Sequence, residues 1–278
     1  MTNSMLISNT HLIVWSKNRA CQLHVLLESI RKNASGIGLT TIIYKADDAH
    51  IESYKNVIEE FAGGGFSFTQ ETDFAADTLK AIDSGDFINV GFCTDDTVFF
   101  KPFDINDLCV ESGRVFSLRL GLNTIMQNCY TGELQPPLNR YAAAGNKITW
   151  RPQDYHPLSN YGYPAALDAH IYNWEQIRTL CKSISFKNTN TLEGGLAQIA
   201  HRHFFSITSF SHSVAVNIPC NNMSGYTNSG EWHSYSCEEL LQKYENGERI
   251  CLKSISAHSF IGCHQEVPFK FIREENNG

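Results

Sequence analysis

The chain has 278 residues, of which 22 are Lys or Arg and 29 are Asp or Glu, so its formal net charge at pH 7 is −7. This surplus of negative charge disfavours nucleic acid as the main partner, because binding to a phosphate backbone needs a concentrated basic face. The length and the 42% of hydrophobic residues fit one large α/β domain with a sizeable core.

No stretch has the roughly 18 uninterrupted apolar residues that a membrane-spanning helix needs. Residues 1–4 do not begin a signal peptide, and the nine cysteines are scattered without a C-x-x-C pair. We therefore expect reduced, mostly buried thiols and no zinc site. The expected location is the cytoplasm, with a peripheral position at the inner face of a membrane as a further option.

The first hundred residues alternate apolar runs that predict strands with periodic segments that predict helices. Strands are expected at 11–15, 40–44, 66–68 and 87–92, and helices at 23–30, 51–61 and 75–82. Such alternation is typical of a Rossmann-like, mostly parallel central sheet with helices on both faces. No G-x-G-x-x-G follows the first strand and no P-loop motif occurs, which disfavours a dinucleotide site and a P-loop.

Three polar clusters follow predicted strands, at residues 16–19, 45–48 and 94–96. Because ligands bind beyond the carboxyl ends of parallel strands, these clusters should converge on one crevice. The adjacent carboxylates of Asp95 and Asp96 repel each other and lose hydration there. A divalent cation is the usual compensation, since Mg²⁺ and Mn²⁺ prefer carboxylate oxygen together with substrate phosphate. A solvated loop with two acidic residues is an equally compatible interpretation of this fragment.

In their order and spacing, these motifs resemble GT-A fold glycosyltransferases of the family 2 type over about residues 11–103. Thr94 stands at the first position of the D-x-D metal motif of that family, and Asp96 at the position that binds the metal. The resemblance is carried by Ser16-Lys17-Asn18-Arg19, Leu23-x-x-x-Leu27-x-Ser29-Ile30, Asp47-Asp48 and Thr94-Asp95-Asp96.

The resemblance implies a GT-A type fold and a hexosyltransferase-like enzyme of polysaccharide biosynthesis. The donor would be a nucleotide-diphosphate sugar, a UDP-sugar being favoured, and the acceptor a saccharide or a glycan- or lipid-linked hydroxyl. One GT-A domain would span residues 1–278, with the nucleotide-sugar half at about 1–103 and the acceptor half at about 104–278. The implied cofactor is Mn²⁺ or Mg²⁺ at Asp96, and the implied nucleotide-binding residues are Ser16, Lys17, Asn18, Arg19, Asp47 (at the base) and Asp95.

Glu193 is the main catalytic candidate of the second half. It precedes a predicted helix at 196–200 with Thr191 as a possible cap, so stabilisation of the helix N-terminus is its ordinary role. In inverting GT-A enzymes an Asp or Glu at a comparable helix start is the general base. The resemblance therefore implies an inverting transfer with Glu193 as base, although a retaining mechanism stays open. Asp168 is the second candidate for the base.

A late histidine lies beside the metal in many GT-A enzymes, and His258 is the expected metal ligand here, with His212 and His264 as rivals. His258 follows a segment, 250–255, that predicts a strand. Aromatic residues in the polar region between 123 and 163 would either stack on sugar rings or pack within loops. They are Tyr130, Trp150, Tyr155, Tyr161 and Tyr163.

Two other functions are compatible with the sequence. A sugar nucleotidyltransferase also combines an α/β sheet with acidic metal ligands, but residues 16–21 lack the Gly-rich, basic phosphate loop typical of such enzymes. A non-catalytic relative that binds a nucleotide or carbohydrate would agree with Thr94 and with the absence of an E-D pair at Glu193.

Overall fold

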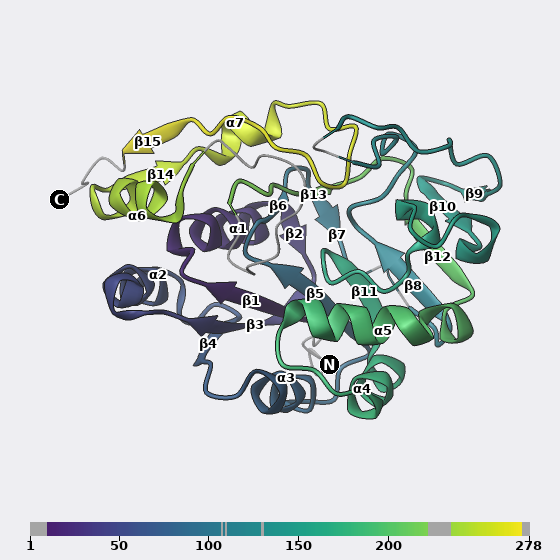
Figure 1. Cartoon of the computed structure of the whole chain (residues 1–278), viewed down its shortest axis with the longest axis horizontal. Coiled ribbons are helices and arrows are strands. Elements are labelled where there is room, and N and C mark those ends of the chain that lie inside the picture. The colour runs from purple at the N-terminus through teal and green to yellow at the C-terminus, as the bar shows by residue number, and fades with distance from the viewer. Residues whose placement is uncertain (1–9, 107, 109, 129–130, 222–234, 274–278) are drawn as a thin grey trace, which may run out of the picture.

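The computed structural model describes residues 10–106, 108, 110–128, 131–221 and 235–273. A nine-stranded sheet runs through the molecule in the order β4-β3-β1-β5-β11-β8-β12-β10-β9. Figure 1 shows α1 and α6 on one side of this sheet and α3, α4 and α5 on the other. Each face carries its own cluster of buried apolar side chains. The predicted α/β fold with helices on both faces is confirmed.

The first half of the chain follows the predicted alternation of strands and helices. β1 (Thr10–Lys17) pairs in parallel with β3 (Ile37–Lys45) and β5 (Asn89–Thr94), and β4 (Phe66–Gln70) pairs in parallel with β3. The connecting helices are α1 (Ala20–Asn33), α2 (Ile51–Phe61), which follows the short η1 (Asp48–His50), and α3 (Phe74–Ile82). β1 lies between β3 and β5, and its successive residues are apolar toward opposite helical layers, with Leu12 and Val14 in one cluster and Ile13 and Trp15 in the other.

The second half extends this parallel core into a mixed sheet. β11 (His170–Asn173) runs antiparallel between β5 and β8 (Arg114–Ser117), and β12 (Ser206–Phe210) pairs in parallel with β8. β10 (Lys147–Trp150) and β9 (Ala142–Ala144) complete the edge in antiparallel pairing. This half also contains α4 (Trp174–Ser183), α5 (Thr189–His203), η2 (Pro152–Asp154) and η3 (Asn160–Gly162).

Three two-stranded sheets lie outside the main sheet. They pair β6 (Thr97–Phe99) with β13 (Ala215–Asn217), β2 (Ala34–Ser35) with β7 (Phe103–Asp104), and β14 (Glu248–Ile250) with β15 (Phe271–Arg273). The β6–β13 pair matters for the site, because it brings Asn217, the last residue of β13, next to the turn that follows β5.

The C-terminal part contains the helices α6 (Cys237–Glu245) and α7 (Leu252–Ser256). The predicted strand at 250–255 is wrong, because β14 ends at Ile250 and α7 follows. Leu252 and Ile255 are both buried, at the i, i+3 spacing of a helix. Among the described residues, no helix is long and apolar enough to cross a bilayer, and none of the seven described cysteines forms a disulfide bond there.

Candidate active site

A cleft of about 840 Å³ opens at the carboxyl edge of the parallel strands. Ser16 and Lys17 end β1, and Thr94 ends β5 just before Asp95 and Asp96; all five line the cleft. Lys45 at the end of β3 and Glu71 after β4 also line it. The predicted convergence of the three strand ends on one crevice is therefore confirmed.

Asp95 holds the end of β1 and the start of α1 together. Its Oδ2 accepts hydrogen bonds from Ser16 Oγ at 2.9 Å and from the backbone N–H of Lys17 at 3.2 Å, and its Oδ1 accepts one from Arg19 Nη1 at 3.0 Å. Burial raises the pKa of Asp95 to about 6, although Arg19 acts in the opposite direction. Both oxygens are thus engaged by the protein itself, as expected of a carboxylate that anchors the site.

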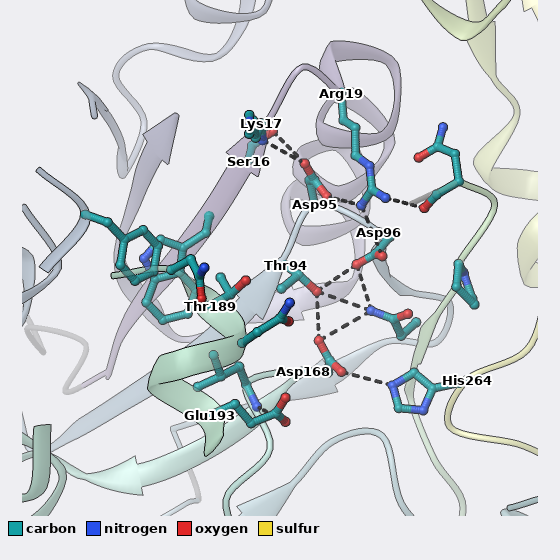
Figure 2. A pocket seen from close by; sticks show the side chains of 18 of the residues that line it. Ser16, Lys17, Arg19, Thr94, Asp95, Asp96, Asp168, Thr189, Glu193 and His264 are labelled. Carbon is teal, nitrogen blue, oxygen red and sulfur yellow. Dashed lines mark hydrogen bonds and ion pairs between the residues drawn. The ribbon is translucent and has the colours of Figure 1, made fainter. Parts of the chain in front are cut away.

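Arg19 brings a fixed positive charge into the cleft. Nη1 contacts Asp95 and also lies 3.3 Å from Asp96 Oδ2, while Nη2 donates to the backbone oxygen of Asn221. Burial disfavours the charge, but Asp95 and Asp96 more than compensate and raise the pKa of Arg19, which stays cationic. Figure 2 shows the guanidinium beside Asp95 and above Asp96.

Asp96 and Asp168 form a close pair of carboxylates. Thr94 Oγ1 lies 2.7 Å from Oδ1 of both, and Asn217 Nδ2 lies 2.7 Å from Asp96 Oδ1 and 3.3 Å from Asp168 Oδ1 (Figure 2). A hydroxyl group has a single hydrogen, so it can donate to only one of two carboxylates. Thr94 Oγ1 therefore lies close to one carboxylate oxygen without donating a hydrogen to it. An added proton or cation at this point would relieve the repulsion between these oxygens.

Asp168 is also paired on its other oxygen. His264 Nε2 lies 3.0 Å and Arg119 Nη1 3.7 Å from Asp168 Oδ2. Burial opposes ionisation of Asp168, but His264 and Arg119 outweigh it and hold its pKa well below the usual range. Burial also opposes charging of His264, yet Cys263 and Asp168 raise the pKa of His264 to about 10. The pair is therefore a carboxylate next to an imidazolium.

Glu193 faces the cleft from α5, and its pKa differs from that of Asp168. Burial, and next the charge of Asp168, raise the pKa of Glu193 to about 7. Its Oε1 accepts a hydrogen bond from the backbone N–H of Leu167 at 3.3 Å, which fixes its direction. A carboxylate with a pKa near neutral can exchange a proton with a hydroxyl group at physiological pH.

The local helix geometry differs from the sequence prediction at this point. α5 begins at Thr189, and Asn188 rather than Thr191 is the N-cap, with Asn188 and Thr191 forming a reciprocal capping box. Glu193 consequently lies in the second turn, where the helix dipole has less effect than at the first turn. Stabilisation of the helix N-terminus is therefore a weak explanation for a carboxylate at position 193.

Two residues predicted to contact the nucleotide do not line the cleft. Asn18 Nδ2 donates to Asp47 Oδ2 at 2.6 Å, and the backbone N–H of Asp47 donates to Asn18 Oδ1 at 2.9 Å. These bonds hold Asn18 at a φ of +54° in the turn between β1 and α1. Instead, the cleft presents Glu71, whose carboxylate lies 3.2 Å from Lys45 Nζ.

The structure also separates the candidate histidines. His264 lines the cleft, whereas His258 packs against Phe260 and neither His258 nor His212 is among the lining residues. Among the described residues, no group of three or more His, Cys, Asp or Glu side chains is placed so that it could hold a metal ion. Asp96 and Asp168 nevertheless offer carboxylate oxygens, and His264 becomes a nitrogen donor when its imidazolium loses its proton. That set suits Mg²⁺ or Mn²⁺, which commonly bind one or two carboxylates plus substrate phosphates.

The aromatic residues of region 123–163 were expected either to stack on sugar rings or to pack within loops. Trp150 and Tyr161 are 2% and 1% exposed, and Trp150 Nε1 donates to the backbone oxygen of Tyr161. Tyr155 packs against Tyr161, and neither Tyr155 nor Tyr163 lines the cleft. Tyr130 lies outside the described residues. Trp150, Tyr155 and Tyr161 pack against one another, so the alternative of ordinary loop packing holds for these three.

Sequence reasoning missed two residues that organise the site, Asn217 and Arg119. Asn217 ends a three-residue strand, and Arg119 follows β8 and is only 3% exposed. Neither belongs to a motif that a single sequence reveals. The one available signal was the position of Arg119 within an apolar run, residues 115–120, because an Arg that is buried there needs an acidic partner.

The fold and the cleft place the chain among mixed α/β proteins with an acidic site at the carboxyl edge of a parallel core. Over 79% of its length it is similar to residues 1–349 of TarS from S. aureus, solved in complex with UDP-GlcNAc, with 13% identity and a TM-score of 0.50. It spans 62% of that chain. At this identity the likeness establishes a shared fold.

Weaker similarities were found to two further solved structures. One is a nucleotidyl transferase from Methanothermobacter, with 8% identity, a TM-score of 0.40 and coverage of 73% of this chain and 88% of that one. The other is 4-diphosphocytidyl-2C-methyl-D-erythritol synthase from Anaerococcus prevotii, with 11% identity, a TM-score of 0.39 and coverage of 77% and 92%. No family model and no curated protein matches the sequence.

Proposed function

We propose that the protein is a metal-dependent glycosyltransferase that moves a sugar from a nucleotide-diphosphate donor to an acceptor hydroxyl. The observation that carries the proposal is the presence of two kinds of carboxylate in one cleft. Asp96 and Asp168 form a tight anionic pair next to Arg19, and Glu193 has a pKa near 7 on the facing helix. A leaving diphosphate needs positive charge, which Arg19 and a cation held by the carboxylate pair would supply. Deprotonation of an acceptor needs a base with a pKa near neutral.

On the donor side, Arg19 and Lys17 supply positive charge for the diphosphate. Asp95 fixes the guanidinium of Arg19, so little reorganisation is needed when negative charge develops on the leaving group. Asp96, together with His264 once its imidazolium has released its proton, would hold a divalent cation, which when bound supplies Lewis-acid stabilisation of that charge. Thr94 and Asn217 keep the Asp96 carboxylate in place.

On the acceptor side, Glu193 would take the proton of the attacking hydroxyl group. The new bond forms from the acceptor oxygen to the anomeric carbon, the bond to the diphosphate oxygen breaks, and the proton moves to a Glu193 oxygen. Attack opposite the leaving group inverts the anomeric configuration. Asp168 is a poorer base, because its pKa lies well below the usual range.

The connection between β1 and α1 favours glycosyl transfer over nucleotidyl transfer. It consists of Asn18 and Arg19 only, and Asn18 is tied to Asp47 by two hydrogen bonds. Such a turn does not provide the Gly-rich loop with which a nucleotidyltransferase would surround a triphosphate.

The test is to incubate the purified full chain with UDP-, GDP-, CDP- and ADP-sugars, with and without Mn²⁺, and to measure release of the nucleoside diphosphate. In parallel, nucleoside triphosphates with sugar phosphates are assayed for pyrophosphate. We expect Mn²⁺-dependent release from one class of donor and no pyrophosphate. Pyrophosphate formation without donor cleavage would identify the alternative enzyme, and nucleotide binding without either product would identify a non-catalytic relative.

A further inference from the structure

The two walls of the cleft differ in how their polar groups are used. On the wall formed by β1 and β5, Ser16, Arg19 and Asp95 are bonded to one another. The opposite wall is here defined as the lining residues between Lys187 and Glu193 together with Gln127, Asn128 and Glu133. In the part of the chain that the structure describes, the side chains of Gln127, Thr189 and Asn190 on this wall have no hydrogen-bond partner.

These groups lie close to the proposed base. Thr189 and Asn190 precede Glu193 by four and three positions in α5, and all three line the cleft. Residues at these spacings lie on one face of a helix, with their Cβ atoms about 5–6 Å apart. Figure 2 shows Thr189 and Glu193 on α5, well separated from Arg19 across the cleft. A molecule held by Thr189 and Asn190 would therefore place a hydroxyl group within reach of Glu193.

The chemistry of this wall selects for a neutral polyol. An amide side chain offers both donors and an acceptor, and so matches neighbouring hydroxyl groups, which do the same. Among the described lining residues of this wall, Lys187 and Glu133 offset each other, and Glu193 adds a negative charge when it is ionised. An anionic group of the acceptor beside Glu193 would be repelled by Glu193 and by Asp168, whereas the diphosphate of the donor meets Lys17 and Arg19.

Stacking contributes little on this side. In the described part of the chain, the aromatic residues that line the cleft are Trp15 and Phe74, which belong to β1 and α3. Trp15 is only 4% exposed, and its Nε1 donates to Thr78 Oγ1. Hydrogen bonding to amides, rather than contact with an aromatic face, is the means of recognition that the acceptor wall offers.

We propose that Gln127, Thr189 and Asn190 form an acceptor subsite for an uncharged saccharide, whose hydroxyl groups they hold while the reacting hydroxyl lies at Glu193. This inference rests on the proposed glycosyl transfer and specifies the acceptor class of the same cleft. Sugars that carry a carboxylate or a phosphate are excluded as acceptors by the acidic residues of the cleft.

The test uses the full chain with its preferred nucleotide sugar, and measures nucleoside diphosphate release with a panel of methyl glycosides. Each neutral hexoside is compared with its uronate and its 6-phosphate. We expect at least one neutral member to accelerate release and its charged counterparts to have no effect. Acceleration by a charged member, or no acceleration by any member, would overturn the subsite. The proposed function would still stand in that case, because the donor is hydrolysed. Absence of donor hydrolysis would instead refute the proposed function.

Variants of the wall give a second readout. Asn190→Ala should raise the KM for the active glycoside about tenfold, the loss expected for one hydrogen bond of about 1.4 kcal/mol. UDP binding to the variant reports that its fold is retained. Asn56→Ala, which removes an exposed amide from α2 on another face, is the matched control and should leave the KM unchanged. An unchanged KM in Asn190→Ala would also count against the subsite.

Discussion

Replacing Glu193 with Gln tests the proposed chemistry most directly. The amide has nearly the shape of the carboxylate and can still accept the hydrogen bond from the backbone of Leu167, but it cannot take a proton. A positioned general base contributes roughly 100- to 10,000-fold to a rate, and we expect Glu193→Gln to slow transfer by that factor. Donor binding, which takes place across the cleft, should be retained.

The raised pKa of Glu193 gives the same variant a signature in pH dependence. The base must be ionised, so the wild-type transfer rate should rise with pH and level off above about 7, and be about a tenth of the plateau at pH 6. The residual activity of Glu193→Gln should not show this rise with pH, because the amide does not titrate.

The stability of the wild type should fall with rising pH, whereas its transfer rate should rise. The pKa of Glu193 is raised from 4.5 to about 7 in the folded protein, so folding disfavours the ionised form. The free energy of unfolding of the wild type is therefore lowered as pH rises from about 4.5 through 7, by roughly 3 kcal/mol in total. The Gln variant avoids this loss, and it should be more stable than the wild type at pH 8 and similar to it near pH 4.5.

The assay is transfer or donor cleavage from pH 5 to 9, together with urea unfolding of both proteins at pH 4.5 and pH 8. A Gln variant with normal turnover would eliminate Glu193 as the base, and Asp168 would be tested next. A variant with lower stability at pH 8 would show that the carboxylate is stabilised rather than disfavoured by its surroundings, which refutes the reasoning for its pKa.

Three further predictions concern the anionic side of the cleft. Asp96→Asn should abolish the Mn²⁺ dependence of UDP binding in calorimetry while the fold is retained; unchanged Mn²⁺ dependence would contradict the metal assignment. His264→Ala should weaken Mn²⁺ affinity by roughly 10- to 100-fold, and His258→Ala, its matched control, should leave the titration as in wild type; the reverse result would restore His258 as the ligand. Asn217→Ala removes the buried amide shared by two carboxylates and should lower the free energy of unfolding by about 1–3 kcal/mol, as measured with urea; an unaltered midpoint would show that the amide does not hold them.

The sequence alone determined the first half of the fold and the place of the site. Apolar runs alternate with helical periodicity there, and in a parallel sheet such alternation leaves few arrangements. The carboxyl ends of the strands must then share one edge, so the residues around Ser16, Lys45 and Asp96 were expected to meet, as they do. Local pattern and global fold agree in this half, which is why the prediction succeeded.

The second half was decided by contacts between distant segments. The position of His264 next to Asp168, and of Asn217 beside Asp96, depends on how β13 and the C-terminal loop pack against the sheet. Residues 250–255 were predicted as a strand, although Leu252 and Ile255 fit a helix, because a short apolar run is compatible with both.

Only the tertiary structure could separate the acids by function. Asp47, Asp95, Asp96, Asp168 and Glu193 all look alike in a sequence, since each is a carboxylate near a predicted element. Their differences come from neighbours far along the chain. Asp47 is held by Asn18, Asp95 by Arg19, and Asp168 by His264, while burial near Asp168 leaves Glu193 with a pKa of about 7. Desolvation and the distances between charges set the character of an ionisable group, and both are properties of the folded chain.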